Sequence, residues 1–360
     1  MDSFDSVSEQ RDAKRLLRAA LAEEPAHAYL FHGPPGIGKR RTALAFAAEL
    51  LGEATRVEHR THPDLYVLEP LGDQIRIDAI RELRRDLHMR PFEAGRRVYL
   101  VFAAHLMNAE AADALLKDLE EPPPYAVIVL VADEVGPLPE TIRSRCQLIP
   151  FHRLSERAVR EEIAARAPEL PADEATAIAR VAAGRLDRAR QLLDPAAARR
   201  RADRLELARA VYRDPRFDAA EAAKRVVEGA RERAREAKAQ AEQELQGTEL
   251  TEREAEQRIR RAQRGAEREE LLGALEELAA WYRDLVAAAA GAETAIVHCD
   301  HAHELQEDAT VDRLAGAEQA AELARGTWRA LEEFNLNAPL AFEALFVELR
   351  RALSAPALPV

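Results

Sequence analysis

The stretch Tyr29-Leu30-Phe31-His32-Gly33-Pro34-Pro35-Gly36-Ile37-Gly38-Lys39-Arg40-Arg41-Thr42 decides how the first part of this chain folds. Its apolar start predicts a strand, its glycines predict a turn, and apolar residues at helical spacing over 43–51 predict a helix. This order is the phosphate-binding P-loop, in which backbone N–H groups, a helix N-terminus and a lysine form an anion cradle. The predicted nucleotide-binding residues are Gly33, Gly36, Ile37, Gly38, Lys39 and Arg40.

The residue after the P-loop lysine departs from the pattern. The pattern places Ser or Thr there because the hydroxyl binds Mg²⁺, and this chain has Arg40. A guanidinium only donates hydrogen bonds and is always charged, so Arg40 cannot replace the hydroxyl. The loop is therefore expected to keep the form of an anion cradle. The sequence leaves open whether ATP or ADP is held there without hydrolysis or the loop only keeps its shape.

Length and composition indicate a helix-rich chain of two or three domains. Of its 360 residues, 47% are apolar, 32% are charged and 5% are aromatic. Two cysteines are too few for a disulfide framework or a four-cysteine zinc site, and they favour a reducing, cytoplasmic location. No apolar run approaches the ~20 residues that a membrane-spanning helix needs, so no membrane partner is expected. Because the net charge is −12, any DNA contact is expected to be local or left to partner subunits.

Alternating strands and helices from residue 28 to 151 predict a three-layer α/β domain with a mostly parallel sheet. Besides the P-loop strand, strands are expected at 65–68, 98–102, 126–132 and 147–151, and helices at 11–23, 77–87 and 109–121. The run over 126–132 is almost wholly apolar, as a strand covered on both faces requires.

From residue 154 onward the pattern predicts helices only. Residues 154–195 favour three short helices, and 196–360 favour a larger helical domain. Within it, residues 228–270 are dense in charges of both signs and predict a solvated helical hairpin with many ion pairs. A nucleic-acid-binding arm is the alternative, which the mixing of acidic and basic residues disfavours.

Six motifs together resemble those of one known family, the AAA+ clamp-loader subunits of bacterial DNA polymerase III. The resemblance implies a P-loop AAA+ core over 1–153, a helical lid over 154–195 and an all-α collar over 196–360. The motifs are Phe4-Asp5-Ser6-Val7, His27-Ala28-Tyr29-Leu30-Phe31, His62-Pro63-Asp64, Ala114-Leu115-Leu116-Lys117-Asp118-Leu119-Glu120-Glu121-Pro122-Pro123, Leu138-Pro139-Glu140-Thr141-Ile142-Arg143-Ser144-Arg145-Cys146-Gln147 and Asn335-Leu336-Asn337-Ala338-Pro339-Leu340-Ala341-Phe342-Glu343.

An active ATPase of this kind needs two carboxylates at the end of a core strand, one for Mg²⁺ and one for the attacking water. In this chain Phe102 and Ala103 stand at those positions, and no acid follows before Glu110. Metal-assisted charge stabilisation contributes several kcal/mol to such chemistry. With Arg40 in place of the hydroxyl as well, we expect essentially no ATP hydrolysis. The alternative is that a shifted residue such as His105 takes over a missing role.

The motif Ser144-Arg145-Cys146 is intact. In related loaders this arginine projects into the ATP site of the neighbouring subunit, so the resemblance implies that Arg145 is an arginine finger acting in trans. Such a finger contributes roughly 10³–10⁵ in rate. The alternative is that Arg145 pairs with an acid of its own chain at the strand edge. Cys146 is expected to be a small packing residue rather than a nucleophile.

Two further segments carry candidate site residues. In the segment Gly184-Arg185-Leu186-Asp187-Arg188-Ala189, which resembles the family's lid motif, Asp187 stands at the nucleotide-contacting position and Arg188 follows it. Arg188 is expected either to contact nucleotide or to hold the lid on the core. The cluster His298-Cys299-Asp300-His301-Ala302-His303 has spacings that could bind a metal, but a solvated histidine loop is the commoner arrangement, so no metal is assigned. No zinc is expected between 39 and 62 either, since that segment has no cysteine.

The hypothesis from the sequence is a non-catalytic stator of the delta-prime type in the clamp loader. It would lend Arg145 to a gamma/tau ATPase subunit, pack with that subunit and with delta through the collar, and act on the sliding clamp and primer-template DNA through the complex. No cofactor is required for this role. The first alternative is an active gamma/tau-like ATPase. A small-molecule P-loop kinase is the second, and it lacks both an acceptor site and a metal carboxylate.

Overall fold

The computed structural model describes residues 3–70, 74–133, 135–245, 251–334 and 336–354. The chain divides into two compact units, Met1–Val159 with Ala183–Arg188, and Arg160–Ala182 with Ala189–Val360. The three-domain division at 153 and 195 stays a prediction, because the contacts separate two units. Among the described residues no helix is both long enough and apolar enough to cross a membrane.

The first unit is built on a five-stranded sheet in the order β2-β3-β4-β1-β5. All four ladders between neighbouring strands are parallel. In the central register, Leu30 lies opposite Leu130 on one side and Leu148 on the other. The strands are β1 (Ala28–His32), β2 (Leu65–Leu68), β3 (Arg97–Phe102), β4 (Ala126–Ala132) and β5 (Gln147–Pro150). The predicted parallel α/β class is therefore confirmed.

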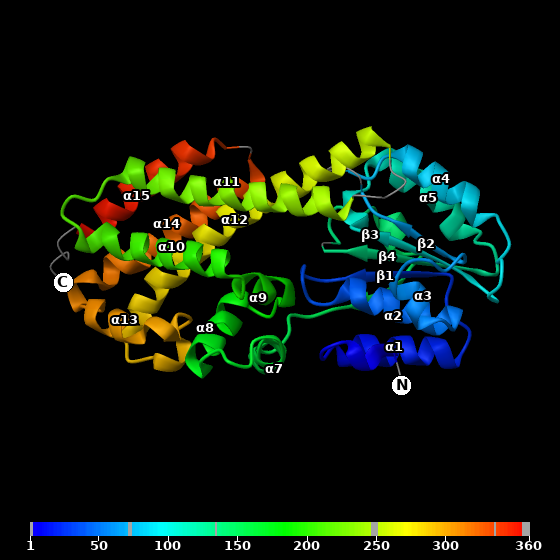
Figure 1. The fold of residues 1–360 in the computed structure, drawn as a ribbon, viewed down its shortest axis with the longest axis horizontal. Coiled ribbons are helices and arrows are strands. Elements are labelled where there is room, and N and C mark those ends of the chain that lie inside the picture. The colour runs from blue at the N-terminus through cyan, green and yellow to red at the C-terminus, as the bar shows by residue number, and fades with distance from the viewer. Residues whose placement is uncertain (1–2, 71–73, 134, 246–250, 335, 355–360) are drawn as a thin grey trace. The chain divides into compact units, whose positions relative to one another are not determined.

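Helices cover both faces of this sheet (Figure 1). Alternate strand residues belong to two separate apolar cores, since successive side chains of a strand point to opposite faces. Tyr29 and Phe31 pack with α1 and α2 on one face, whereas Leu30 packs with α4 and α5 on the other. The helices of this unit are η1 (Ser3–Ser6), α1 (Arg11–Ala22), α2 (Lys39–Leu51), α3 (Ala54–Glu58), α4 (Ile77–Leu87), η2 (Ala104–Leu106), α5 (Ala109–Glu120) and α6 (Glu140–Arg143).

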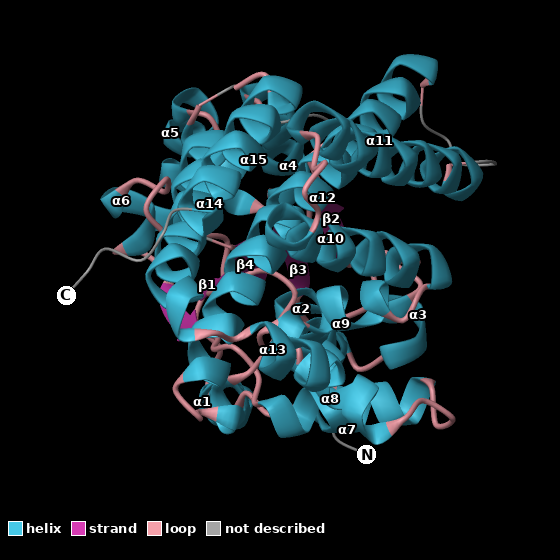
Figure 2. Cartoon of the chain, turned by 90° about the vertical axis from the view of Figure 1, so that its left-hand side faces the viewer, coloured by secondary structure: helices cyan, strands magenta, loops and turns pink. Residues whose placement is uncertain are grey.

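Every regular element described after β5 is a helix, as the sequence predicts. Figure 2 draws the helices in cyan, and the strands, in magenta, all belong to residues 28–150 among the described residues. The helices after β5 are α7 (Glu156–Arg166), α8 (Ala172–Ala182), α9 (Leu186–Leu192), α10 (Pro195–Arg213), α11 (Ala219–Glu244), α12 (Glu252–Ala289), η3 (Glu293–Ala295), η4 (Cys299–His301), α13 (Ala302–Asp308), η5 (Val311–Arg313), α14 (Leu314–Glu333) and α15 (Ala338–Ser354).

Of the charged segment 228–270, residues 228–244 lie in α11 and 252–270 in α12, and residues 246–250 lie outside the described residues. The two long helices pack along each other. Their charges pair on the exposed faces, as between Arg235 and Glu228 at 3.1 Å. The inner side of α11 is an alanine stripe, with Ala230, Ala234 and Ala237 all buried. Small side chains let the two helix backbones approach closely, so the pair is held together despite having few large apolar residues.

A buried ionic network ties α10 to α11 and α12 in the second unit. Arg204 pairs with Glu270 and, at 2.5 Å, with Glu277. Arg200 reaches Glu270 at 3.3 Å and Glu236 at 3.0 Å. The side chain of Glu277 is 3% exposed and that of Arg204 is 11% exposed. The pKa of Arg204 lies above its usual range, because its two glutamates outweigh the opposing effect of burial. These charges are therefore compensated inside the helical core.

Candidate functional site

The P-loop runs from the end of β1 to the first turn of α2, and its glycines take backbone shapes that other residues avoid. Gly33 has φ +140°, and a Cβ there would lie 2.2 Å from the backbone oxygen of Phe151. Gly36 has φ +71°, and a Cβ there would lie 1.7 Å from Oδ1 of Asp187. The loop is thus pressed against the exit of β5 and against the 183–188 segment. Only glycine fits at these two close approaches.

Lys39 is folded back into its own loop rather than extended outward. Its Nζ donates to the carbonyl oxygens of Gly33, at 2.6 Å, and Pro34, and it pairs with Oδ1 of Asp133 at 2.8 Å. The side chain is 3% exposed. Burial lowers the pKa of Lys39 below its usual range, while the Asp133 carboxylate opposes that shift. The lysine cation is therefore neutralised by an acid that directly follows β4.

Arg40 stands at the sequence position where the P-loop pattern has the metal-binding hydroxyl. Its guanidinium carbon lies 4.3 Å from the ring centroid of Phe102, and the guanidinium pairs with Glu69. Two positions that depart from the active pattern, Arg40 and Phe102, therefore contact each other. A stacked, paired guanidinium contributes positive charge and no lone pair. The residues at this position do not fit Mg²⁺.

The end of β3 carries no acidic group for the attacking water. Ala103 follows Phe102 in a left-handed conformation, with φ +53°. The Nδ1 atom of His105 accepts a hydrogen bond from the backbone N–H of Asp133 at 3.1 Å. This bond occupies one ring nitrogen of His105 in fixing the Asp133 backbone. The geometry thus disfavours His105 as a substitute for the missing carboxylates.

The predicted lid residues lie against the P-loop through Asp187. The backbone N–H of Leu186 donates to the carbonyl oxygen of Gly36 at 2.8 Å. The Asp187 carboxylate receives Arg185 in a forked pair, Nε to Oδ1 at 3.2 Å and Nη2 to Oδ2 at 3.0 Å. It also accepts the backbone N–H of Arg188 at 2.8 Å. A nucleotide contact from the Arg188 side chain stays a prediction.

Arg145 lies just before β5 and is paired within its own chain. Its Nη2 lies 2.5 Å from Oε1 of Glu120, at the end of α5. Its Nη1 donates to the carbonyl oxygen of Thr141 at 3.0 Å and to Oγ of Ser144 at 3.4 Å. The side chain remains 34% exposed. The own-chain pairing that the sequence raised as an alternative is therefore present, and a role in trans requires Arg145 to exchange Glu120 for another anion.

Cys146 is buried beside this arginine. Burial raises the pKa of its thiol to about 12, so the thiolate is scarce at neutral pH. This is what the sequence predicts for a packing residue.

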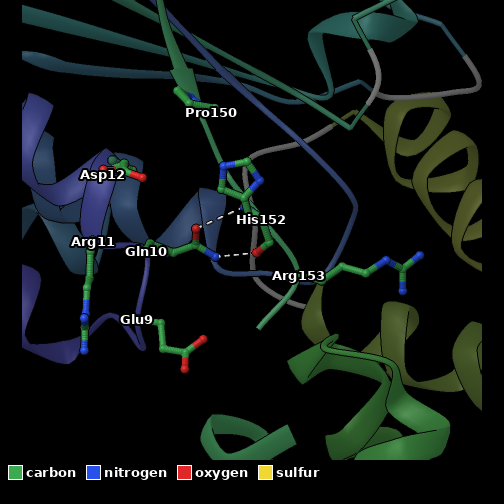
Figure 3. Close-up of a pocket in the computed structure, with 8 residues that line it drawn as sticks. Glu9, Gln10, Arg11, Asp12, Pro150, His152 and Arg153 are labelled. Atoms are coloured by element: carbon green, nitrogen blue, oxygen red, sulfur yellow. Dashed lines mark hydrogen bonds between the residues drawn. The ribbon is translucent and has the colours of Figure 1, made fainter. Parts of the chain in front are cut away.

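Gln10 is a positioning residue that the sequence analysis missed (Figure 3). It is buried, with φ +49°, and its amide bonds both polar groups of the His152 backbone, at 2.7 and 3.1 Å. The same amide lies 3.4 Å from the carbonyl oxygen of Ile37. Together with Glu9 and Arg153 it lines a pocket of about 230 Å³. Gln10 thus links the P-loop to the residues that follow β5. The sequence could not predict this link, because a polar residue before a helix is common and does not indicate a distant partner.

The motif His62-Pro63-Asp64 has a structural role. The Asp64 carboxylate is buried and accepts backbone N–H groups of Phe92 at 2.6 Å, Glu93 at 2.9 Å and Ala94 at 2.8 Å. Burial alone would raise the pKa of Asp64, but these hydrogen bonds outweigh it and hold the pKa below its usual range. Asp64 therefore anchors the loop that leads into β3.

We expect the Asp64→Asn variant to lose about 2 kcal/mol of unfolding free energy at neutral pH, because one acceptor and the charge are lost. A lowered pKa in the folded state adds stability above the ordinary aspartate pKa, which is lost as the pH falls. The difference between Asp64→Asn and the native chain should therefore shrink on acidification below about pH 4. Urea unfolding at pH 7 and pH 3.5 measures this, and an equal difference at both pH values would contradict it.

The histidine cluster around residue 298 is not the solvated loop that the sequence favoured. His298 is fully buried, and its Nδ1 lies 2.9 Å from Oδ2 of Asp284 on α12. The ring packs near Trp281, with centroids 5.8 Å apart. His298 is buried rather than solvated because α12 supplies a buried acid, Asp284, which is 14 residues away in sequence. The described residues contain no group of three or more side chains suited to a metal ion.

Comparison with known proteins finds relatives of the first unit. Residues 9–155 match the family model described as DNA polymerase III, delta subunit. The chain is 33% identical over 165 residues to DNA polymerase III subunit delta' of Bacillus subtilis, covering 42% of this chain and 50% of that protein. It is 39% identical over 163 residues to subunit delta' of Pseudomonas aeruginosa, covering 41% and 50%. The chain thus spans about half the length of the curated relatives it matches.

The chain also matches other subunits of DNA polymerase III. The tau subunit of Bacillus subtilis is 33% identical over 167 residues, covering 43% of this chain and 30% of that protein. Among solved structures, a gamma-subunit-related protein from Thermotoga maritima is similar with a TM-score of 0.43 and 18% identity, covering 94% of this chain and 99% of that one.

The five parallel strands, with a P-loop after β1 and helices on both faces, define a P-loop core of the AAA+ class. Residues 9–155 are similar to the DNA polymerase III delta family and to subunits named delta', in agreement with the resemblance of the motifs. The relatives include both delta' and tau proteins, so their names alone do not separate a stator from an ATPase.

Proposed function

We propose that this chain is a non-catalytic stator of the delta-prime type in a DNA polymerase III clamp loader, acting in DNA replication. The observation that carries the proposal is the contact of Arg40 with Phe102 and Glu69 where the metal would be held. This geometry disfavours the gamma/tau-like ATPase, because Arg40 replaces the metal-binding hydroxyl and Phe102 and Ala103 stand where β3 would end in two carboxylates. The nearby Glu69 carboxylate is paired with Arg40 itself. The chain requires no nucleotide turnover, zinc or other cofactor for this role.

The catalytic contribution of the chain is proposed to be made in trans by Arg145. Its side chain is partly exposed, and its guanidinium pairs with the carboxylate of Glu120. Phosphate oxygens are bidentate acceptors of higher charge, so they can outcompete a single exposed carboxylate for the guanidinium. A neighbouring gamma/tau subunit would supply those phosphates. Arg145 would then stabilise the charge that develops during hydrolysis in the neighbour's site.

The proposed partners are the gamma/tau and delta subunits, with the sliding clamp and primer-template DNA engaged through the complex. The relatives named delta' and tau support a setting with several such subunits.

Reconstitution tests this proposal. The chain is mixed with purified gamma/tau and delta subunits, the sliding clamp and primed DNA, and ATP hydrolysis and clamp loading are measured with and without it. We expect both activities to depend on the chain, and the isolated chain to show no Mg²⁺-dependent ATP turnover. Turnover by the isolated chain would support the ATPase alternative, and full loader activity without the chain would contradict the stator role.

Glu120 should compete with the neighbour's phosphates for the Arg145 guanidinium. In the Glu120→Gln variant the competing carboxylate is gone, so we expect loader ATP hydrolysis at limiting ATP to rise by about 1.5- to 5-fold, the value of an exposed ion pair. The exposed neighbour Glu121, changed to Gln, is the matched control and should leave the rate as it is. A fall in rate with Glu120→Gln would show that Glu120 positions the finger rather than competing for it.

A further inference from the structure

The anion cradle of this P-loop is already supplied with carboxylates by the chain itself. The three protons of the Lys39 ammonium have three acceptors, namely the carbonyl oxygens of Gly33 and Pro34 and the Asp133 carboxylate. A P-loop lysine serves a nucleotide by reaching its outer phosphates. Here that ammonium is buried and its charge is neutralised internally, so a phosphate would have to displace Asp133 to reach it.

A second carboxylate lies at the turn of the loop. Oδ1 of Asp187 lies so close to Gly36 that a Cβ built on the glycine would be 1.7 Å from it. The Leu186 N–H donates to the Gly36 carbonyl oxygen, and the Arg185 guanidinium holds the Asp187 carboxylate in a fork. Asp187 therefore occupies space directly over the glycine turn whose N–H groups would otherwise face a phosphate.

We propose that Asp187 is a built-in anion that closes this P-loop to nucleotides and locks the 183–188 segment onto the loop. A nucleotide phosphate would meet a carboxylate of the same charge in the space that it needs, and like charges at contact distance repel strongly. The residues of the site therefore fit a nucleotide poorly, and the loop acts as a structural joint. This inference does not depend on the clamp-loader role, since it concerns the isolated chain.

Nucleotide binding by the full chain tests the inference. The probe is N-methylanthraniloyl-ADP, and the chains compared are the native one, Asp187→Ala and Asp187→Asn. The control is Asp203→Ala, which removes a 64%-exposed acid on α10. We expect no measurable binding by the native chain and the control. Both Asp187 variants should bind measurably, with an affinity at least about tenfold above the detection limit of the assay, because a like charge next to the phosphate is removed.

Two outcomes overturn the inference: equal binding by the native chain and the Asp187 variants, and no binding by any of them, since Asp187 would then not be what excludes nucleotide. A variant could also fail to bind because it unfolds, so thermal unfolding is measured as a second readout. Gly36→Ala should lower the melting temperature through its clash with Asp187, and adding Asp187→Ala should restore part of the loss. If the melting-temperature effects of Gly36→Ala and Asp187→Ala simply add, the two residues do not contact each other and the inference is wrong. Neither readout uses loader activity. A failure of this inference can therefore be told apart from a failure of the proposed stator function.

Discussion

An Arg145→Ala chain assembled with the other loader subunits is expected to lower ATP hydrolysis at the neighbouring site by about 10³-fold or more. The guanidinium is a fixed, always charged fork that can hold two phosphate oxygens at once, and alanine removes both its charge and its donors. Pre-steady-state hydrolysis by the assembled loader, in the presence of primed DNA and clamp, measures the effect on the site that Arg145 completes. Clamp loading should fall with it.

Two further variants are the controls for this measurement. Arg145→Lys keeps the charge and loses the fork, so it should recover only part of the rate. Arg15→Ala removes an arginine on α1 whose side chain is 76% exposed, and it should leave the rate unchanged. Equal rates for the native chain and Arg145→Ala would show that the own-chain pair with Glu120 is the whole role of Arg145.

The second large effect is expected in the ionic network of α10, α11 and α12. Glu277→Ala leaves the buried Arg204 guanidinium without one of its two carboxylates, and breaking a buried pair in this way costs about 3–5 kcal/mol of unfolding free energy. Both tryptophans of the chain, Trp281 and Trp328, lie in the second unit. Tryptophan fluorescence during urea unfolding therefore reports on this unit.

An exposed pair supplies the comparison. Glu256→Ala on α12 breaks the i,i+4 pair with Arg260, whose side chains are 59% and 67% exposed, and should cost about 0.5 kcal/mol or less. A cost for Glu277→Ala as small as that for Glu256→Ala would show that water or Glu270 compensates Arg204 fully.

Local pattern was sufficient for most of the fold. The P-loop stretch predicted a strand, a turn and a helix, and these are β1, the loop and α2. The apolar run over 126–132 predicted a strand covered on both faces, and β4 is fully buried between two helical layers. These predictions succeed because side-chain periodicity and glycine content act over a few neighbouring residues.

The contacts that define the candidate site were less predictable, because each joins segments distant in sequence. Arg40 could be recognised as a departure from the pattern, but its partners Phe102 and Glu69 could not. Asp187 could be aligned with a lid position, but its approach to Gly36 depends on how the chain returns to the loop. His298 was misjudged for the same reason, since its partner Asp284 is brought to it by the packing of α12.

By itself, the sequence determined the class of fold, the position of the P-loop and the absence of the hydroxyl and acids that metal-dependent hydrolysis needs. These follow from residue identities at fixed local spacing. Only the tertiary structure decided what takes their place: a guanidinium stacked on Phe102, carboxylates at Lys39 and Gly36, and Glu120 on Arg145. The physical reason is that charge neutralisation and steric closure depend on distances of a few ångströms between segments that only folding brings together.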